Sequence, residues 1–154
     1  MKILMVCLGN ICRSPMAQGI LEKKVQEAGL QDQISVDSAG TSDYHVGDKP
    51  DPRAIEKSSK YDIDISAYRG RQFEKDDFEA FDRIFAMDFS NYENILRLSR
   101  SKEDSKKVEM ILNLSKPNSN MSVPDPYYGG EEGFENVYQL LDAACDELMT
   151  QIKA

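Results

Sequence analysis

Short apolar runs alternate along the chain with stretches in which apolar residues recur every three or four positions. A short continuous apolar run is typical of a strand that is buried on both faces of a sheet. We predict four strands, at residues 3–6 (ILMV), 34–40 (ISVDSAG), 83–87 (RIFAM) and 107–112 (KVEMIL).

The stretches between the predicted strands carry helix signals. Ser14 is a candidate cap with Pro15 at the first helical position, and Gly29 is placed to end that helix. The apolar residues between them share one helical face: Ala17, Ile20, Leu21, Val25 and Ala28.

Three further helices are predicted, two from their start signals and one from its apolar spacing. Asp51 and Pro52 mark one start, and Ser90 with Glu93 forms a capping box that opens a helix through about Leu98. The C-terminal segment places apolar residues at helical spacing: Phe134, Val137, Leu141, Ala144, Leu148 and Ile152.

Strand and helix therefore alternate from one end of the chain to the other. This order predicts an α/β fold in which a doubly wound sheet of about four parallel strands carries helices on both faces. With 154 residues, the chain has the length of one domain spanning 1–154. Ligands of such folds bind beyond the carboxyl ends of the strands, and Cys7 lies at that edge.

The composition narrows the function classes. Forty per cent of the residues are hydrophobic and 30% are charged, with no apolar run near the roughly 18 residues that a membrane span needs. The first ten residues lack the features of a signal peptide. A net charge of −8 opposes binding to nucleic acid and to anionic membranes. We expect a cytoplasmic monomer with neither kind of partner.

Metal binding is also disfavoured. Cys7, Cys12 and Cys145 have no zinc-finger spacing, and His45 is the one histidine of the sequence. We read His45, in a polar loop, as an exposed residue at the rim of the site, and Cys145 as a core residue. No metal and no cofactor are predicted.

The stretch CLGNICRSP, residues 7–15, joins the first strand to the first helix. Such a loop turns backbone N–H groups inward, and the helix dipole adds positive charge there, so the loop favours an anion. We expect Gly9 to supply a positive φ, and Asn10 also tolerates that conformation. The loop is too short for a Walker A motif, and it lacks the lysine of that motif.

Cys7 and Arg13 are the reactive candidates in this loop. Cys7 lies at its floor, where the field favours a thiolate nucleophile, and Arg13 offers a planar fork that matches two oxygens of a phosphate. Ser14 either donates its hydroxyl to the thiolate or caps the helix. In the alternative interpretation, Cys7 is an ordinary buried strand residue and Arg13 is a surface charge. The strand before the loop and the helix start after it argue against this alternative.

This loop resembles the phosphate-binding loop of the low-molecular-weight protein tyrosine phosphatases, and the resemblance continues through DSAGTSDYHVGDKPDPRA, DFEAFDRIFAMDFSN and VPDPYYGGEEGFENVY. It implies that Cys7 forms a phosphocysteine, that Arg13 holds the phosphoryl oxygens and that Asp125 is the general acid. The substrates would be phosphotyrosine-containing proteins and small aryl phosphates, with inorganic phosphate as the product. It also implies that Asn10, Ser14 and Ser38 support the loop. The loop itself would comprise Leu8, Gly9, Asn10, Ile11, Cys12, Arg13 and Ser14.

The segment VPDPYYGG supplies the acid and two candidate pocket walls. A phenolate leaving group needs a proton, and Asp125 between two prolines could donate it and later accept one from water. The same Asp-Pro and Gly-Gly pairs are also ordinary turn chemistry. Tyr127 and Tyr128, with Tyr44 opposite, could wall an aromatic slot that favours phosphotyrosine. Partial packing of a surface loop is nearly as good an account of these tyrosines.

Cys12 is a candidate redox partner. A reversible disulfide with Cys7, as family members form, would protect the nucleophile from irreversible oxidation. The alternative is that Cys12 fills the underside of the loop. Two departures from the family affect substrate preference and loop rigidity: Tyr44 is often tryptophan in bacterial relatives, and Tyr68 stands where several members have histidine.

Three other functions are alternatives to tyrosine phosphatase activity. Arsenate reductases with this loop use two further cysteines in a later segment, and none lies between Cys12 and Cys145. Protein arginine phosphatases in the family have threonine where this chain has Ile11. A phosphopeptide-binding module would need neither Cys7 nor Asp125.

Overall fold

The structure, a computed structural model, describes residues 1–154 with the exception of the Tyr128 side chain. Its centre is a four-stranded parallel sheet with the order β2-β1-β3-β4. The strands are β1 (Lys2–Cys7), β2 (Ser35–Gly40), β3 (Arg83–Ala86) and β4 (Val108–Met110).

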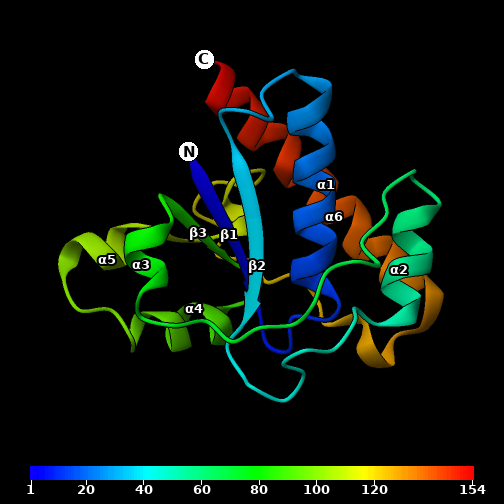
Figure 1. Ribbon diagram of the computed structural model, residues 1–154, viewed down its shortest axis with the longest axis horizontal. Coiled ribbons are helices and arrows are strands. Elements are labelled where there is room, and N and C mark those ends of the chain that lie inside the picture. Colours follow the sequence, from blue (N-terminus) through cyan, green and yellow to red (C-terminus); the bar gives the residue numbers. More distant parts are fainter.

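Helices cover both faces of this sheet (Figure 1). One face carries α1 (Arg13–Glu27), α2 (Pro52–Ser59) and α6 (Gly130–Lys153); the other carries α3 (Asp77–Ala80), α4 (Phe89–Leu96) and α5 (Lys102–Lys106). Two 3₁₀ turns, η1 (Ile111–Asn113) and η2 (Pro126–Tyr128), complete the elements. The predicted α/β fold is confirmed, although the short helices α3 and α5 were not foreseen.

Strand β1 is buried on both faces, which explains its continuous apolar run. Ile3 and Met5 belong to the cluster formed with α1 and α6, whereas Leu4 and Val6 belong to the cluster formed with α3 and α4. Successive side chains of a strand point to opposite faces, so one apolar segment contributes to two cores.

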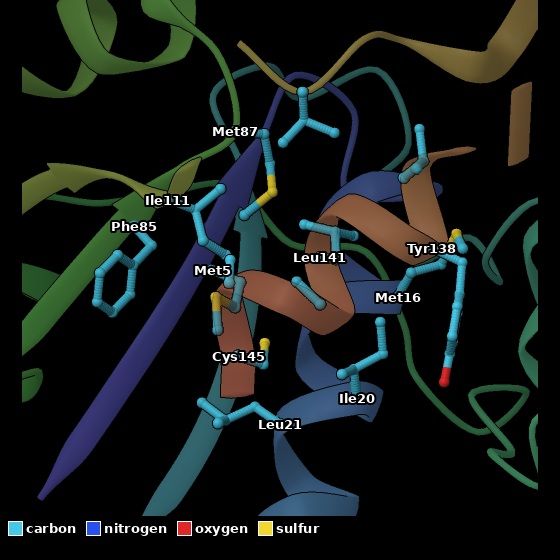
Figure 2. Close-up of a cluster of buried hydrophobic side chains, with 14 of the residues drawn as sticks. Met5, Met16, Ile20, Leu21, Phe85, Met87, Ile111, Tyr138, Leu141 and Cys145 are labelled. Atoms are coloured by element: carbon cyan, nitrogen blue, oxygen red, sulfur yellow. The ribbon is translucent and has the colours of Figure 1, made fainter. Parts of the chain in front are cut away.

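The larger core lies between the sheet and the pair α1 and α6. Figure 2 shows Met5 and Phe85 of the sheet beside Met16 of α1 and Leu141 of α6. Cys145 is fully buried in the same cluster, as its predicted core role requires. Across the part of the chain that the structure describes, no helix is long and apolar enough to cross a membrane.

The first helix does not begin as predicted. It starts at Arg13, with Cys12 at the cap position and no side-chain cap. Ser14 is not the cap because its hydroxyl is hydrogen-bonded to the thiol of Cys7. The other end is as expected: the helix stops at Glu27, and Gly29 follows with a φ of 72°.

The predicted capping box of Ser90 and Glu93 is also wrong. Helix α4 is capped by Asp88, whose carboxylate accepts a hydrogen bond from the backbone N–H of Asn91 (2.7 Å). Strand β4 is shorter than predicted because the chain turns into η1 directly after Met110.

The order of the strands creates a crevice at their carboxyl ends. The chain runs from β1 through α1 to β2, and then crosses to β3 on the other side of β1. Where connections leave in opposite directions, the loops separate and leave space for a ligand. Cys7 ends one of the two strands at this point, and Asp88 follows the other.

We predict that the α1–α6 core governs stability. Leu141→Ala should lower the free energy of unfolding by about 2–5 kcal/mol, because it removes buried methyl groups and leaves a cavity. Urea denaturation would measure the change. Val46→Ala is the control: Val46 is 57% exposed, and its truncation should cost about 0.5 kcal/mol or less. Equal effects of the two substitutions would contradict this account of the core.

Candidate active site

Five residues, 8–12, connect the end of β1 to the start of α1. The turn is made by Asn10, which adopts a φ of 60°. The positive φ predicted for Gly9 is wrong, since Gly9 is not among the residues with this conformation. The backbone N–H of Asn10 points to Sγ of Cys7 at 3.3 Å, so the turn brings a donor to the thiol.

Two glycines lie in close contact with their neighbours here, and Gly40 is the more restricted because its neighbours are backbone atoms. A Cβ atom on Gly9 would lie 3.0 Å from Cδ2 of His45. A Cβ atom on Gly40, at the end of β2, would lie 2.8 Å from the carbonyl oxygen of Leu8 and 3.2 Å from the nitrogen of Asn10. The loop therefore rests directly on the backbone of the neighbouring strand.

The side-chain amide of Asn10 holds the turn from inside. Its Nδ2 donates to Oγ of Ser14 (2.9 Å) and to Oγ of Ser38 (3.0 Å), and its Oδ1 accepts from the backbone N–H of Arg71 (3.0 Å). Ser38 in turn donates to Oε1 of Gln18 (2.7 Å). The three residues predicted to support the loop thus form one hydrogen-bond network.

This network also orients the hydroxyl of Ser14. Because Oγ of Ser14 accepts from Asn10, its own hydrogen is available for Sγ of Cys7 at 3.0 Å. Donors directed at a sulfur stabilise its thiolate form. Of the two roles predicted for Ser14, the structure supports that of donor to Cys7.

Arg13 lies at the start of α1, next to the loop, with only 4% of its side chain exposed. Its Nη1 donates to Oδ2 of Asp88 (2.7 Å) and to the carbonyl oxygen of Val123 (3.0 Å), and its Nη2 lies 3.8 Å from Oδ2 of Asp125. Burial lowers the pKa of the guanidinium, but the negative charges of Cys7, Asp88 and Asp125 raise it by more. The cation is therefore held in place and kept charged.

Asp125 stands at the mouth of the site with half of its side chain exposed. It caps η2, where its Oδ1 accepts from the backbone N–H of Tyr127 (3.0 Å). Its other oxygen faces Arg13. The local turn and the approach to the buried cation fix the direction of this carboxylate.

Cys7, Arg13 and Asp125 line one cavity of about 310 Å³. Tyr44 and Tyr127 also line it, with 78% and 41% of their surfaces exposed. The Tyr128 side chain, predicted as a third wall, lies outside the described part of the structure. The remaining lining residues are Leu8, Gly9, Ile11, Cys12 and His45.

Comparisons with known proteins identify relatives that match nearly the whole chain. A sequence model of the family "Low molecular weight phosphotyrosine protein phosphatase" matches residues 2–154. The chain belongs to this family. A Synechocystis protein provisionally named a low molecular weight protein-tyrosine-phosphatase is 49% identical, over 99% of this chain and 96% of its own.

Solved structures of the family have the same fold. A protein tyrosine phosphatase from Entamoeba histolytica superimposes with a TM-score of 0.93 at 37% identity, covering 99% of this chain and 97% of its own. A Drosophila protein named an arginine phosphatase has a TM-score of 0.92 at 32% identity, covering 100% and 99%. The predicted membership of the phosphatase family is confirmed, whereas the roles of individual residues stay predictions.

Cys12 is the last residue of the loop of this phosphatase and is buried. Burial, followed by the negative charges of Asp51, Cys7 and Asp125, raises the pKa of its thiol far above the ordinary value. All three cysteines are free thiols in the structure. A protonated thiol attacks slowly, so a disulfide with Cys7, which stays a prediction, would have to begin with oxidation of Cys7.

Of the two residues that depart from the family pattern, Tyr44 lines the cavity and Tyr68 does not. Tyr68 donates through its hydroxyl to Oε2 of Glu22 (2.7 Å), and the loop is held by the backbone N–H of Arg71. His45, predicted at the rim of the site, lines the cavity with 37% of its side chain exposed, and its Nδ1 lies 3.0 Å from Oδ2 of Asp48.

Sequence reasoning missed the residues that hold Arg13 and the loop from a distance. Asp88 carried one usable signal, because it lies two residues after the buried strand β3, at the edge where Cys7 ends β1. Gln18 and Gly40 carried none. Their roles depend on contacts between segments that are far apart in the sequence.

Gly40→Ala should distort the phosphate-binding loop, because the new methyl group would meet the loop backbone at 2.8 Å. We expect affinity for inorganic phosphate to fall by about tenfold or more, as measured by calorimetry. Gly29→Ala is the control: it strains a residue with positive φ but has open space around it, so it should lower stability and leave phosphate affinity unchanged. Unaltered affinity in Gly40→Ala would contradict the close approach.

Proposed function

We propose that this protein hydrolyses phosphotyrosine on proteins, and small aryl phosphates, through a phosphocysteine intermediate on Cys7. One observation carries the proposal: Cys7, Arg13 and Asp125 line the same cavity, with the thiol at its buried end and the carboxylate at its mouth. A nucleophile, an oxyanion-binding cation and an acid in this arrangement suit the cleavage of a phosphate monoester.

The first step transfers the phosphoryl group to sulfur. The Cys7 thiolate attacks phosphorus, and the bond to the tyrosine oxygen breaks. Arg13 binds the phosphoryl oxygens with a guanidinium whose orientation is preset by Asp88 and Val123. Backbone N–H groups of the loop add further donors, so the charge of the transition state meets groups that need not reorganise.

Asp125 serves both halves of the reaction. It donates its proton to the departing phenolate oxygen, whose conjugate acid has a pKa near 10. The resulting carboxylate then removes a proton from the water that attacks the phosphocysteine. Inorganic phosphate leaves, and Cys7 and Asp125 return to their starting states. The reaction uses no cofactor and no metal ion.

The shape of the cavity favours an aromatic substrate. Leu8 and Ile11 of the loop provide apolar surface to the cavity, which Tyr44 and Tyr127 also line. A phosphotyrosine ring could stack between the two tyrosines. The similarity to a Drosophila arginine phosphatase makes phosphoarginine the second candidate substrate, although the arginine phosphatases described above have threonine in place of Ile11. We further propose that the protein acts as a monomer in the cytoplasm.

Turnover of a phosphotyrosine peptide in the presence of EDTA tests this function. Cys7→Ser should abolish hydrolysis, and Asp125→Asn should lower kcat/KM by about 100-fold or more because the phenolate then leaves without a proton. Asp43→Asn, which changes an exposed carboxylate of the loop after β2, should have no effect. Steady-state kinetics on the purified variants would measure these changes.

Two results would redirect the assignment. Turnover of a phosphoarginine peptide without turnover of phosphotyrosine would identify an arginine phosphatase. Binding of phosphopeptides with no turnover of either substrate would identify a binding module and contradict the proposed roles of Cys7 and Asp125.

A further inference from the structure

Arg53, in the first turn of α2, makes contacts with three separate parts of the chain. Its Nε and Nη2 donate to the two carboxylate oxygens of Asp51 at 3.0 and 2.9 Å. Its Nη1 donates to the carbonyl oxygen of Tyr127 at 2.7 Å. The guanidinium carbon also lies 5.1 Å from the ring centre of Tyr127 and 5.0 Å from that of Phe134.

One end of this arrangement is fixed to the phosphate-binding loop. The backbone N–H of Asp51 donates to the carbonyl oxygen of Ile11 at 2.7 Å. Asp51 is almost fully buried, and hydrogen bonds from Arg53 lower the pKa of its carboxyl group. The guanidinium is thus anchored on a charged group that is itself attached to the loop around Cys7.

The other end is fixed to the acid. Tyr127 receives Arg53 at its carbonyl oxygen and donates from its own N–H to Oδ1 of Asp125. Asp125 lies between two prolines, Pro124 and Pro126, which have no backbone N–H with which to hold the segment. A continuous series of hydrogen bonds therefore runs from Ile11 through Asp51, Arg53 and Tyr127 to the carboxylate of Asp125.

We propose that Arg53 is a positioning residue for the general acid: it fixes the segment that carries Asp125 relative to the phosphate-binding loop. This inference rests on the proposed function, in which Asp125 protonates the leaving group. Arg53 is not among the residues that line the cavity around Cys7. Its planar group is needed because an ammonium group cannot form two parallel bonds to Asp51 and a third in the same plane to Tyr127.

A positioning role and a purely structural role differ in their dependence on the leaving group. Loss of acid positioning slows the release of a basic phenolate strongly and that of an acidic one weakly, because an acidic phenolate leaves without a proton. General damage to the fold or to the loop would slow both reactions equally. Comparison of phenyl phosphate with 4-nitrophenyl phosphate, whose phenol is far more acidic, separates the two roles.

Arg53→Met should lower kcat/KM for phenyl phosphate by about tenfold or more and that for 4-nitrophenyl phosphate by about threefold or less. Arg53→Lys should restore little of this loss. Arg100→Met is the matched control: Arg100 also pairs with a nearby aspartate, Asp104, and with Glu79, and its loss should leave both values unchanged.

Two measurements connect the effect to Asp125. In the Asp125→Asn background, Arg53→Met should cause no further loss with phenyl phosphate, since no acid is left to position. The rate at which iodoacetate alkylates Cys7 should be the same in Arg53→Met and in the wild type, because the nucleophile and its loop are unchanged.

Equal losses with the two aryl phosphates, an additional loss in the Asp125→Asn background, or slower alkylation of Cys7 would each overturn the inference. Its failure is distinguishable from that of the proposed function. If the wild-type protein hydrolyses neither aryl phosphate, both the proposed function and the role of Arg53 are wrong. A second outcome is that the wild-type protein hydrolyses both aryl phosphates and that Asp125→Asn slows phenyl phosphate more than 4-nitrophenyl phosphate. If Arg53→Met then slows the two substrates equally, only the role of Arg53 is wrong.

Discussion

The hydrogen bonds of the Asn10 side chain are the constraint on which the site depends. They hold a residue with positive φ at the tip of the loop, where most side chains are disfavoured. They also turn the hydroxyl of Ser14 toward Cys7. Donors that are fixed before the substrate arrives need no reorganisation during the reaction, and this is where an enzyme gains most from electrostatics. The shape of the loop and the position of the Ser14 hydroxyl beside Cys7 thus have one cause.

The topology of the sheet explains a second feature of the site, the fixed direction of the buried Arg13 guanidinium. Because β1 and β3 are neighbours, Asp88 at the end of β3 reaches Arg13 at the start of α1. A buried ion pair adds little net stability, since desolvation offsets much of the attraction. Its value here lies in orientation: one nitrogen is held by Asp88 and Val123, and the other lies toward Asp125 and the cavity.

The sequence was informative where local signals decide the structure. The apolar run before Cys7 and the spacing from Cys7 to Arg13 were enough to predict the strand, the loop, the helix and their place at the carboxyl edge of the sheet. It was misleading at Ser14 and Ser90, which both look like helix caps. The hydroxyl of Ser14 is hydrogen-bonded to Cys7 instead, and helix α4 is capped by Asp88 rather than by Ser90. It was silent on Gln18, Gly40 and Arg53, whose contacts join segments that only the folded chain brings together.

Helix α1 carries the guanidinium of Arg13 in its first turn and, directly behind it, core residues such as Met16 and Ile20. Successive residues of a helix are turned by about 100°, so the direction of Arg13 is set by the packing of the residues that follow it. The interior between α1 and α6 therefore contributes to stability and also helps to orient the guanidinium that is proposed to bind phosphate. Substitutions that loosen that interior would therefore also change the direction of the Arg13 guanidinium.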